Sequence, residues 1–149
     1  MSRFVTIPRG LRVDPDGRWR IGEEFVCHDR SLVFFKSHLV FEEDGAFIED
    51  AGRRLPVEVS GPAFEVVRLD LDAVRGQAIV ILDDGSAEAL GDASLGINPD
   101  TGRFECAVRG GRASAMLSRG AHQTLLEHAE EENGRFYLRS GLARFAIRT

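Results

Sequence analysis

Residues 42–48, Glu-Glu-Asp-Gly-Ala-Phe-Ile, return in altered form at residues 131–137 as Glu-Glu-Asn-Gly-Arg-Phe-Tyr. At a constant offset of 89, the two stretches share both glutamates, the glycine and the phenylalanine. Asp-Gly and Asn-Gly are strong turn signals, and the residues after each turn favour a strand. The pair therefore indicates the end of one structural block that occurs twice.

Each stretch follows a helical pattern that is itself preceded by a cysteine, Cys27 or Cys106. Apolar spacing predicts helices over Ser31–Phe41, with Asp29 or Ser31 as N-cap, and over Ser118–Glu131, with Ser118 as N-cap. Acidic residues near the second helix end are expected to form a solvated face: Glu127, Glu130, Glu131 and Glu132. A helix and a hairpin cannot bury their apolar faces alone, so we expect two strand-helix-turn-strand units that stack. The alternative is coincidence, since an acidic turn followed by an aromatic residue is common after helices.

The other segments are short, alternate between apolar and polar residues, and lie between turn signals, which is typical of strands. Strands are expected at Trp19–Ile21, Glu24–Cys27, Phe47–Ile48, Leu55–Val59, Glu65–Ala73, Gln77–Leu82, Ala87–Leu90, Leu95–Ile97, Arg103–Val108, Phe136–Leu138 and Ala143–Ile147. In the clearest of them, Val67, Leu69, Leu71 and Ala73 are expected on one face. The sequence thus predicts an α+β fold of two related strand-helix-turn-strand units, with antiparallel sheets and two main helices. The N-terminal α+β unit covers residues 11–60 and the C-terminal α+β unit covers 61–149, either apart or packed as one compact domain.

Composition excludes several classes of protein. The 149 residues are 43% hydrophobic and 29% charged, which is typical of a globular domain rather than a disordered or collagen-like chain. The longest apolar run, Ala78–Leu82, is far shorter than the roughly 20 residues of a membrane helix, so no membrane association is expected. The net charge of -5 disfavours nucleic-acid binding, which needs a basic face. Only the segment from Arg103 onward is basic, with eight arginines against five acidic residues.

Cysteine and histidine usage indicates a reduced, metal-free chain. The two cysteines are expected to be free thiols, and the stretch MSRFVTIPRG has no apolar segment typical of a signal peptide, so we expect a cytoplasmic protein. Neither a CxxC nor an HxxxH pair occurs among His28, His38, His122, His128 and the cysteines. No metal and no cofactor are therefore expected.

The strongest candidate for chemistry is an arginine- and glycine-rich segment before the second helix. It comprises Arg109, Gly110, Gly111 and Arg112, followed by Ser118 and Arg119. Backbone N–H groups at a helix N-terminus favour anions, glycines let the backbone approach a ligand, and arginine forks suit phosphate or carboxylate. We therefore expect an anion site at the start of the second helix. The alternative is a β-turn whose arginines pair with acidic residues of the chain.

Other clusters are better explained by structure. Cys27 and His28 are neighbours, and neighbours on a strand face opposite ways, so they do not form a nucleophile–base pair easily. The apolar residues before Cys27 suggest a buried thiol. Asp83-Asp84 is explained by turn chemistry, and Asp70 and Asp72 by the polar face of a strand. No catalytic residue is assigned.

The order of several motifs is that of a known family. These motifs are Asp16-Gly17-Arg18-Trp19, Leu32 with Phe35–Leu39, Glu43-Asp44-Gly45, Val57–Val66 (VEVSGPAFEV), Val108–Gly111, Ala115, Arg119 and Leu125-Leu126. In this order the chain resembles, as a distant member, the uncharacterised bacterial family called domain of unknown function 1285, from about Leu11 to the C-terminus. It departs from the family pattern at Glu23-Glu24-Phe25, Leu55-Pro56 and Gly61–Phe64. The resemblance implies an α+β fold of two related units, a general link to ligand sensing or signalling, and no established reaction.

The sequence therefore favours a non-enzymatic ligand-binding or signalling module that takes a small anionic ligand. One alternative is a small enzyme that uses Cys27 or a histidine in a pocket between the units. Another is a protein-interaction module, with a protein partner or a second copy of the chain on the apolar first helix, at Val33 and Phe34, or on a strand edge.

Overall fold

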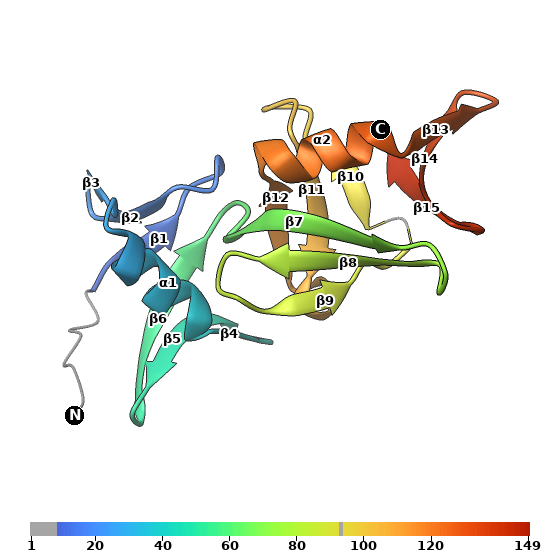
Figure 1. Ribbon diagram of the computed structural model, residues 1–149. Coiled ribbons are helices and arrows are strands. Elements are labelled where there is room, and N and C mark those ends of the chain that lie inside the picture. Colours follow the sequence, from blue (N-terminus) through green and yellow to red (C-terminus); the bar gives the residue numbers. More distant parts are fainter. Residues whose placement is uncertain (1–8, 93) are drawn as a thin grey trace. The chain divides into compact units, whose positions relative to one another are not determined.

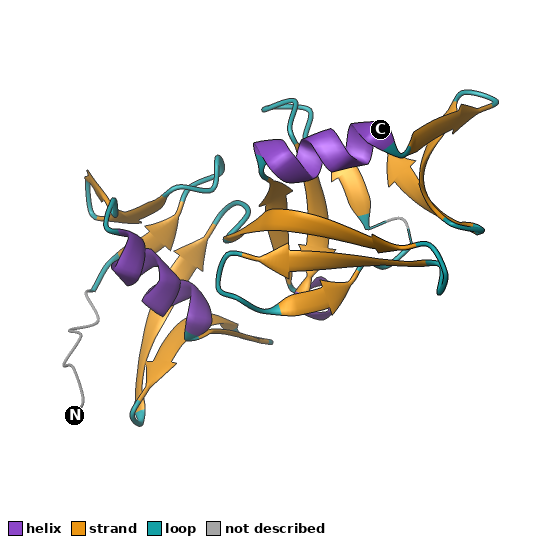
Figure 2. Ribbon diagram, in the orientation of Figure 1, coloured by secondary structure: helices purple, strands orange, loops and turns teal. Residues whose placement is uncertain are grey.

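The computed structural model describes residues 9–92 and 94–149 (Figure 1), so most of the N-terminal stretch considered above lies outside the described residues. The chain divides into two compact units, the first ending at Ala63 and the second running from Phe64 to Thr149. In each unit, a helix accompanies a β-sheet (Figure 2), so the fold is α+β and mostly β.

The described part of the first unit forms a six-stranded sheet in the order β3-β2-β1-β6-β5-β4. Its elements are β1 (Leu11–Val13), β2 (Trp19–Ile21), β3 (Glu24–Phe25), α1 (Asp29–Ser37), β4 (Leu39–Glu42), β5 (Gly45–Asp50) and β6 (Arg53–Val59). Helix α1 buries Phe35, whose ring stacks on that of Trp19 with 6.0 Å between centroids. These rings, together with the buried Val13 and Ile48, form the core of this unit.

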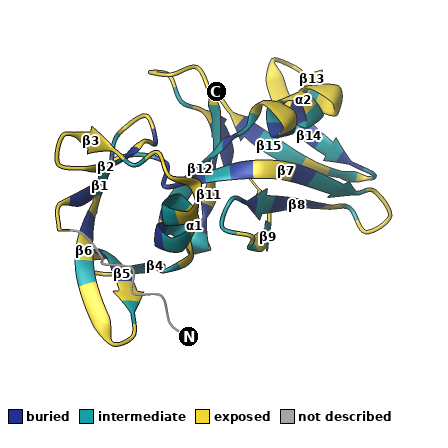
Figure 3. Cartoon of the chain, turned by 60° about the vertical axis from the view of Figure 1, so that its left-hand side comes forward, coloured by how far each residue is buried: buried dark blue, intermediate teal, exposed yellow. Residues whose placement is uncertain are grey.

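The described part of the second unit forms a nine-stranded sheet in the order β13-β14-β15-β10-β11-β12-β7-β8-β9. Its elements are β7 (Phe64–Asp72), β8 (Gln77–Leu82), β9 (Ala87–Ala89), β10 (Leu95–Ile97), β11 (Phe104–Val108), a 3₁₀ turn (Arg109–Gly111), β12 (Ala113–Leu117), α2 (Arg119–Glu127), β13 (Ala129–Glu132), β14 (Arg135–Ser140) and β15 (Ala143–Arg148). Helix α2 packs against β7 and β12 and buries Ala121 and Leu125. Buried residues alternate with less buried ones along strands such as β8 (Figure 3), as the two-residue period of a strand requires.

The sheets are mixed, which corrects the expectation of antiparallel sheets. Strand β1 pairs with β6, β10 with β15, and β12 with β7, all in parallel. The two strands of each parallel pair are separated in the sequence by several other elements, because a parallel pair needs a long crossover. Turn signals identify only strands joined by short hairpins, so the sequence pattern does not reveal these pairs.

Strands β1–β6 with α1, called here the first repeat, and strands β10–β15 with α2, the second repeat, have the same organisation. In sheet order, β4-β5-β6-β1-β2-β3 corresponds to β13-β14-β15-β10-β11-β12. From the helix onward, each element of the second repeat starts 90 residues after its counterpart, as the C-caps His38 and His128 illustrate. The offset of 89 read from the sequence is one residue short, because Asn133-Gly134 takes the place of Glu43-Asp44 at the hairpin tip.

Both helices end earlier than the apolar periodicity predicts. Helix α1 ends at Ser37, and the next strand begins at Leu39, inside the predicted helix 31–41. Helix α2 ends at Glu127, and Ala129 already belongs to β13. The apolar residues that extend the helical pattern therefore lie on the first strand of a hairpin.

A histidine ends each helix in the same way. The ring Nδ1 of His38 lies 2.8 Å from the carbonyl oxygen of Phe34, and the ring Nδ1 of His128 lies 3.0 Å from that of Thr124. A carbonyl oxygen only accepts hydrogen bonds, so each Nδ1 carries the proton and donates. The ring of His38 thus adds to the backbone hydrogen bond that Phe34 already accepts, and the ring of His128 binds a carbonyl group at the helix end, where such groups often lack a partner.

The acidic residues after α2 were expected to form a solvated helix face, but they lie on a strand. Glu130 and Glu132 lie on β13 and form ion pairs with Arg139 and Arg144 of the neighbouring strands. The hydrogen bond from Arg139 lowers the pKa of Glu130 below its usual range. Cross-strand pairing therefore accounts for acidic side chains that the sequence alone places on a helix.

The predicted N-caps are right for one helix and wrong for the other. The Oγ of Ser118 accepts a hydrogen bond of 3.1 Å from the backbone N–H of Ala121, as expected for the cap of α2. Helix α1 is instead preceded by His28, whose side chain makes no capping hydrogen bond, in place of Asp29 or Ser31.

A β-bulge changes the predicted face of β7. The register against β8 shifts between Val66 and Arg68, so Val67 is the extra residue and is 43% exposed. Val66 is buried in its place, whereas Leu69 is buried as predicted. A bulge exchanges the two faces of a strand beyond it, which simple alternation cannot anticipate. Neither helix in the described part of the chain is long and apolar enough to cross a membrane.

Candidate functional site

Arg109 is held by acidic side chains rather than left open to a ligand. Its guanidinium lies 2.6 Å from Asp84 and 3.2 Å from Glu88, and it covers the ring of Phe64 at 4.7 Å. Its backbone N–H also donates to the carboxylate of Glu88. For Arg109, this ion pairing matches the alternative considered above, in which arginines of a β-turn pair with acidic residues of the chain.

The six expected site residues lie in two places. Arg109, Gly110 and Gly111 form the 3₁₀ turn before β12, with Arg112 directly after it, whereas Ser118 and Arg119 follow the end of β12. The five residues of β12 span roughly 16 Å at about 3.3 Å per residue. The turn and the start of α2 are therefore at opposite ends of one strand.

The start of α2 borders a hollow of about 460 Å³, called here the α2 hollow. Its lining includes Arg103, Ser118, Arg119, His122, Gln123 and Leu126. Two lining residues are not part of the expected site: Arg103, which directly precedes β11, and His122, which lies on α2 three residues after Arg119. The ring of His122 stands edge-on against that of Phe104, with 5.1 Å between centroids.

The charged residues that line the α2 hollow are both cationic. Arg103 donates one hydrogen bond, of 3.2 Å, to the carbonyl oxygen of Leu117. Arg119 is exposed, and within the described residues its guanidinium has no hydrogen-bonding or ion-pairing partner. Because an arginine carries five N–H donors, these two side chains keep most of their donors available.

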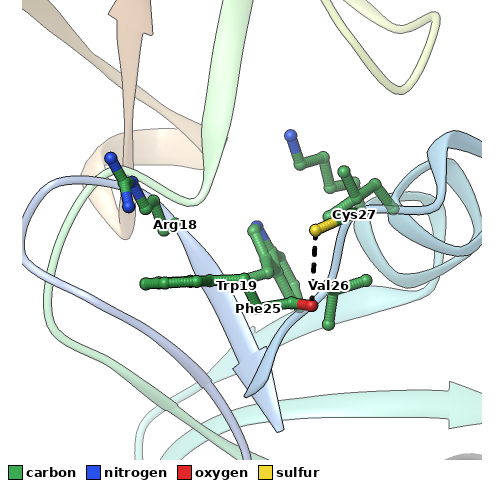
Figure 4. A pocket seen from close by; sticks show the side chains of 8 residues that line it. Arg18, Trp19, Phe25, Val26 and Cys27 are labelled. Atoms are coloured by element: carbon green, nitrogen blue, oxygen red, sulfur yellow. Dashed lines mark hydrogen bonds between the residues drawn. The ribbon is translucent and has the colours of Figure 1, made fainter. Parts of the chain in front are cut away.

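A second hollow, of about 340 Å³, lies beside α1 and is called here the α1 hollow. Its lining includes Arg18, Trp19, Phe25, Val26, Leu32 and Lys36, together with Cys27. In Figure 4, Arg18 lies on one side and Cys27 on the other, with Trp19, Phe25 and Val26 between them. No local sequence motif marks this hollow, because its apolar residues are typical of an ordinary core.

The two cysteines differ in environment. Cys27, expected to be buried, is exposed, and its Sγ donates to the carbonyl oxygen of Phe25 at 3.6 Å. Within the described residues, that thiol contacts no histidine. Cys106 is buried, and burial, with smaller contributions from Glu88 and Glu105, raises the pKa of its thiol to about 12.

The aspartate pairs behave as the sequence predicts. Asp84 accepts hydrogen bonds from the backbone N–H and the Oγ of Ser86 in the turn between β8 and β9. Asp70 forms an exposed ion pair with Arg68 at 2.7 Å. In the part of the chain that the structure describes, no group of three or more histidine, cysteine or acidic residues is arranged to hold a metal ion.

No family model matches the chain, and no curated protein matches its sequence. Solved structures do resemble it. A DUF1285 family protein from Silicibacter pomeroyi is 21% identical and covers 95% of this chain and 81% of its own, with a TM-score of 0.72. A DUF1285 family protein from Shewanella baltica is 12% identical and covers 80% of this chain and 91% of its own, with a TM-score of 0.59. The resemblance that the motifs indicate is thereby confirmed, and the chain has the fold of the DUF1285 family proteins.

Proposed function

We propose that the protein is a non-enzymatic ligand-binding module that holds a small hydrophilic anion in the α2 hollow. The observation that carries the proposal is the convergence of Arg103, Arg119 and His122 on one hollow whose lining contains no acidic residue. The hollow is thus a cationic patch on a chain whose net charge is -5. The expected anion site is thus kept at Ser118 and Arg119, and it no longer includes Arg109.

The donors around the hollow suit phosphate or carboxylate. Arginine forks form charge-assisted hydrogen bonds with planar or tetrahedral anions, and Gln123 adds an amide donor. The positive end of α2 contributes in the same direction. The volume of about 460 Å³ lies within the range of roughly 300–1,000 Å³ found for small-molecule sites.

Binding is favoured over catalysis by the contacts of the thiol. A cysteine nucleophile needs a base within hydrogen-bond reach, but the thiol of Cys27 is engaged with a backbone carbonyl. Signalling would follow if occupation of the hollow changed a contact with another protein.

Titration calorimetry with inorganic phosphate tests the proposal. Arg119→Ala should weaken phosphate binding about tenfold, because it removes charge-assisted hydrogen bonds, and it should leave the fold intact because that side chain has no partner in the described structure. Arg135→Ala, which removes an exposed arginine outside the hollow, should bind phosphate as the unchanged protein does.

Ionic strength gives a second measure of the same site. Since the arginines are exposed, raising the salt to about 1 M, where the Debye length is about 3 Å, should weaken phosphate binding strongly. Phosphate binding that is equal in Arg119→Ala and Arg135→Ala, or no binding at low salt, would show that the α2 hollow is not the site.

A further inference from the structure

We propose that the α1 hollow is a second binding site, which takes a small organic anion with an apolar body, such as a medium-chain carboxylate. This site lies in the first unit and is independent of the anion proposed for the α2 hollow. The argument rests on its position in the repeat, on its lining, and on the two cations at its edge.

The α1 and α2 hollows occupy the same place in their repeats. The backbone N–H of Asp14 donates to the carbonyl oxygen of Arg18 at 2.8 Å, and the N–H of Asn98 donates to that of Arg103 at the same distance. Arg18 and Arg103 are therefore equivalent positions at the start of β2 and β11. On the helices, Leu32 and Lys36 correspond to His122 and Leu126, 90 residues later.

The lining of the α1 hollow has an apolar character that the α2 hollow lacks. Leu32 stands where the second repeat has His122, and Val26 and the half-exposed Phe25 add further apolar surface. Covering such surface with a ligand is favourable because it removes apolar area from water. An apolar hollow of this kind favours a ligand with a hydrocarbon or aromatic body.

Trp19 provides a fixed wall for that body. Its indole Nε1–H donates to the carbonyl oxygen of Ala63 at 3.1 Å, and its ring stacks on Phe35. The side chain is 2% exposed. Its orientation is thus set by the protein before any ligand arrives, which reduces the entropy lost on binding.

The edge of the hollow carries positive charge. The guanidinium of Arg18 lies over the ring of Phe25 at 4.9 Å, whereas Arg20, at 5.0 Å from the same ring, is neutralised by Asp14 and Glu23. The Nε of Arg18 lies 3.4 Å from Asp16, and its terminal N–H groups are further donors of the same fork. Arg18 and, on the helix side, Lys36 are the two cations of the lining, and they favour an anionic head group on a ligand whose apolar body enters the hollow.

Trp19 is the only tryptophan of the chain, so its fluorescence reports on this hollow. Octanoate should change the fluorescence in a saturable way. Acetate, which has the head group without the body, should cause no saturable change, and octanol, which has the body without the charge, should bind about tenfold more weakly. A linear response that acetate reproduces would overturn the proposal.

Cys27 gives a readout that localises the ligand. It is exposed and lines the hollow, whereas the other cysteine, Cys106, is buried. Saturating octanoate should slow the alkylation of Cys27 by N-ethylmaleimide, measured by mass spectrometry. Unchanged alkylation together with a change in Trp19 fluorescence would place octanoate elsewhere and contradict the proposal.

Two variants test the residues involved. Leu32→Asp should abolish octanoate binding. Arg18→Gln changes an exposed residue and should leave the fold intact even if Leu32→Asp does not. It should weaken octanoate binding about tenfold. Leu126→Asp, at the position equivalent to Lys36 in the other repeat, is the matched control and should bind octanoate normally. Normal octanoate binding by folded Arg18→Gln would show that the charged edge takes no part in binding, which would contradict the proposal. Since phosphate binding is measured separately, each proposal can fail alone.

Discussion

The two repeats have the same strand order but differ at the outer edge of their third strand. Among the described residues, β3 is an edge strand of two exposed residues, whereas its counterpart β12 has five residues and pairs on its outer side with β7. An unpaired edge invites association, and a short edge strand limits that risk. The comparison teaches that the repeat is a complete module, which the second unit extends by three strands.

The same comparison separates the position of a hollow from its chemistry. Each repeat has a hollow between the start of its second strand and its helix, so the fold sets the position. The lining follows from single side chains, since Leu32 is replaced by His122 and Lys36 by Leu126. The two hollows thus share a position in the repeat but differ in the chemistry of their linings.

The largest expected effect comes from the matched core residues of the two repeats. Ile48 and Leu138, 90 residues apart on β5 and β14, are both 0% exposed. Ile48→Ala and Leu138→Ala should each lower the free energy of unfolding by about 3 kcal/mol, because each leaves a cavity. Urea unfolding followed by circular dichroism measures this, and Val74→Ala, at a 96% exposed residue, is the control. A cost below about 1 kcal/mol for one of the two would show that the repeats are not packed alike.

The sequence predicts the hairpins well and the rest of the fold less well. Gln77–Leu82 and Leu95–Ile97 are strands over the expected residues, because alternation and turn residues are local signals. The parallel pairing of Val13 with Val59 has no such signal, since it depends on how the whole chain returns. The strand Ala113–Leu117 was missed because small residues give it little alternation in hydrophobicity.

The candidate sites show the same limit. The sequence identifies Arg109 and Arg119 as cations near glycines, but the partner of each depends on distant segments. Arg109 meets Asp84 because the β8–β9 hairpin brings that carboxylate to it, while Arg119 meets no acid in the described structure. Arg103 joins the site only through the register of β11, so no local motif marks it.

A smaller effect is expected where the second unit departs from the repeat. Arg109 bridges Asp84 and Glu88 of the added strands, and the side chain of Asp84 is 6% exposed. Arg109→Ala should lower the free energy of unfolding at pH 7 by about 2–3 kcal/mol, because it leaves a buried carboxylate without its cation. Urea unfolding measures the loss, with Arg112→Ala, an exposed neighbour, as the comparison.

The loss in Arg109→Ala should depend on pH. Burial raises the pKa of Asp84, but hydrogen bonds from Ser86 and the charge of Arg109 outweigh it, so the folded pKa lies below the ordinary value of 3.8. A lowered pKa stabilises the fold above the ordinary value, and this contribution disappears as the pH falls through the folded pKa. The cost of Arg109→Ala should therefore shrink in acid. An equal cost of Arg109→Ala at pH 7 and in acid would mean that the ion pair with Asp84 does not cause the loss of stability.

The smallest expected effect is in a pair of arginines that the two repeats share. Arg54 pairs with Glu42 and covers the ring of Phe47 at 4.7 Å. Ninety residues later, Arg144 pairs with Glu132 and covers the ring of Tyr137 at 4.1 Å. The same side-chain arrangement has thus been kept on both hairpins, although the residues are exposed.

Exposed ion pairs and cation–π contacts stabilise proteins only slightly, so Arg54→Ala and Arg144→Ala should each lower Tm by about 1–2 °C. Arg54 also pairs with Glu49, so its replacement should have the larger effect of the two. Because the arginines lie in different units and share no partner, the shifts should add in the double variant. Differential scanning calorimetry at low and high salt measures both shifts. If salt abolishes the shift in one variant alone, the ion pair matters in that repeat and the aromatic contact in the other, and the two hairpins are alike in geometry but not in energetics.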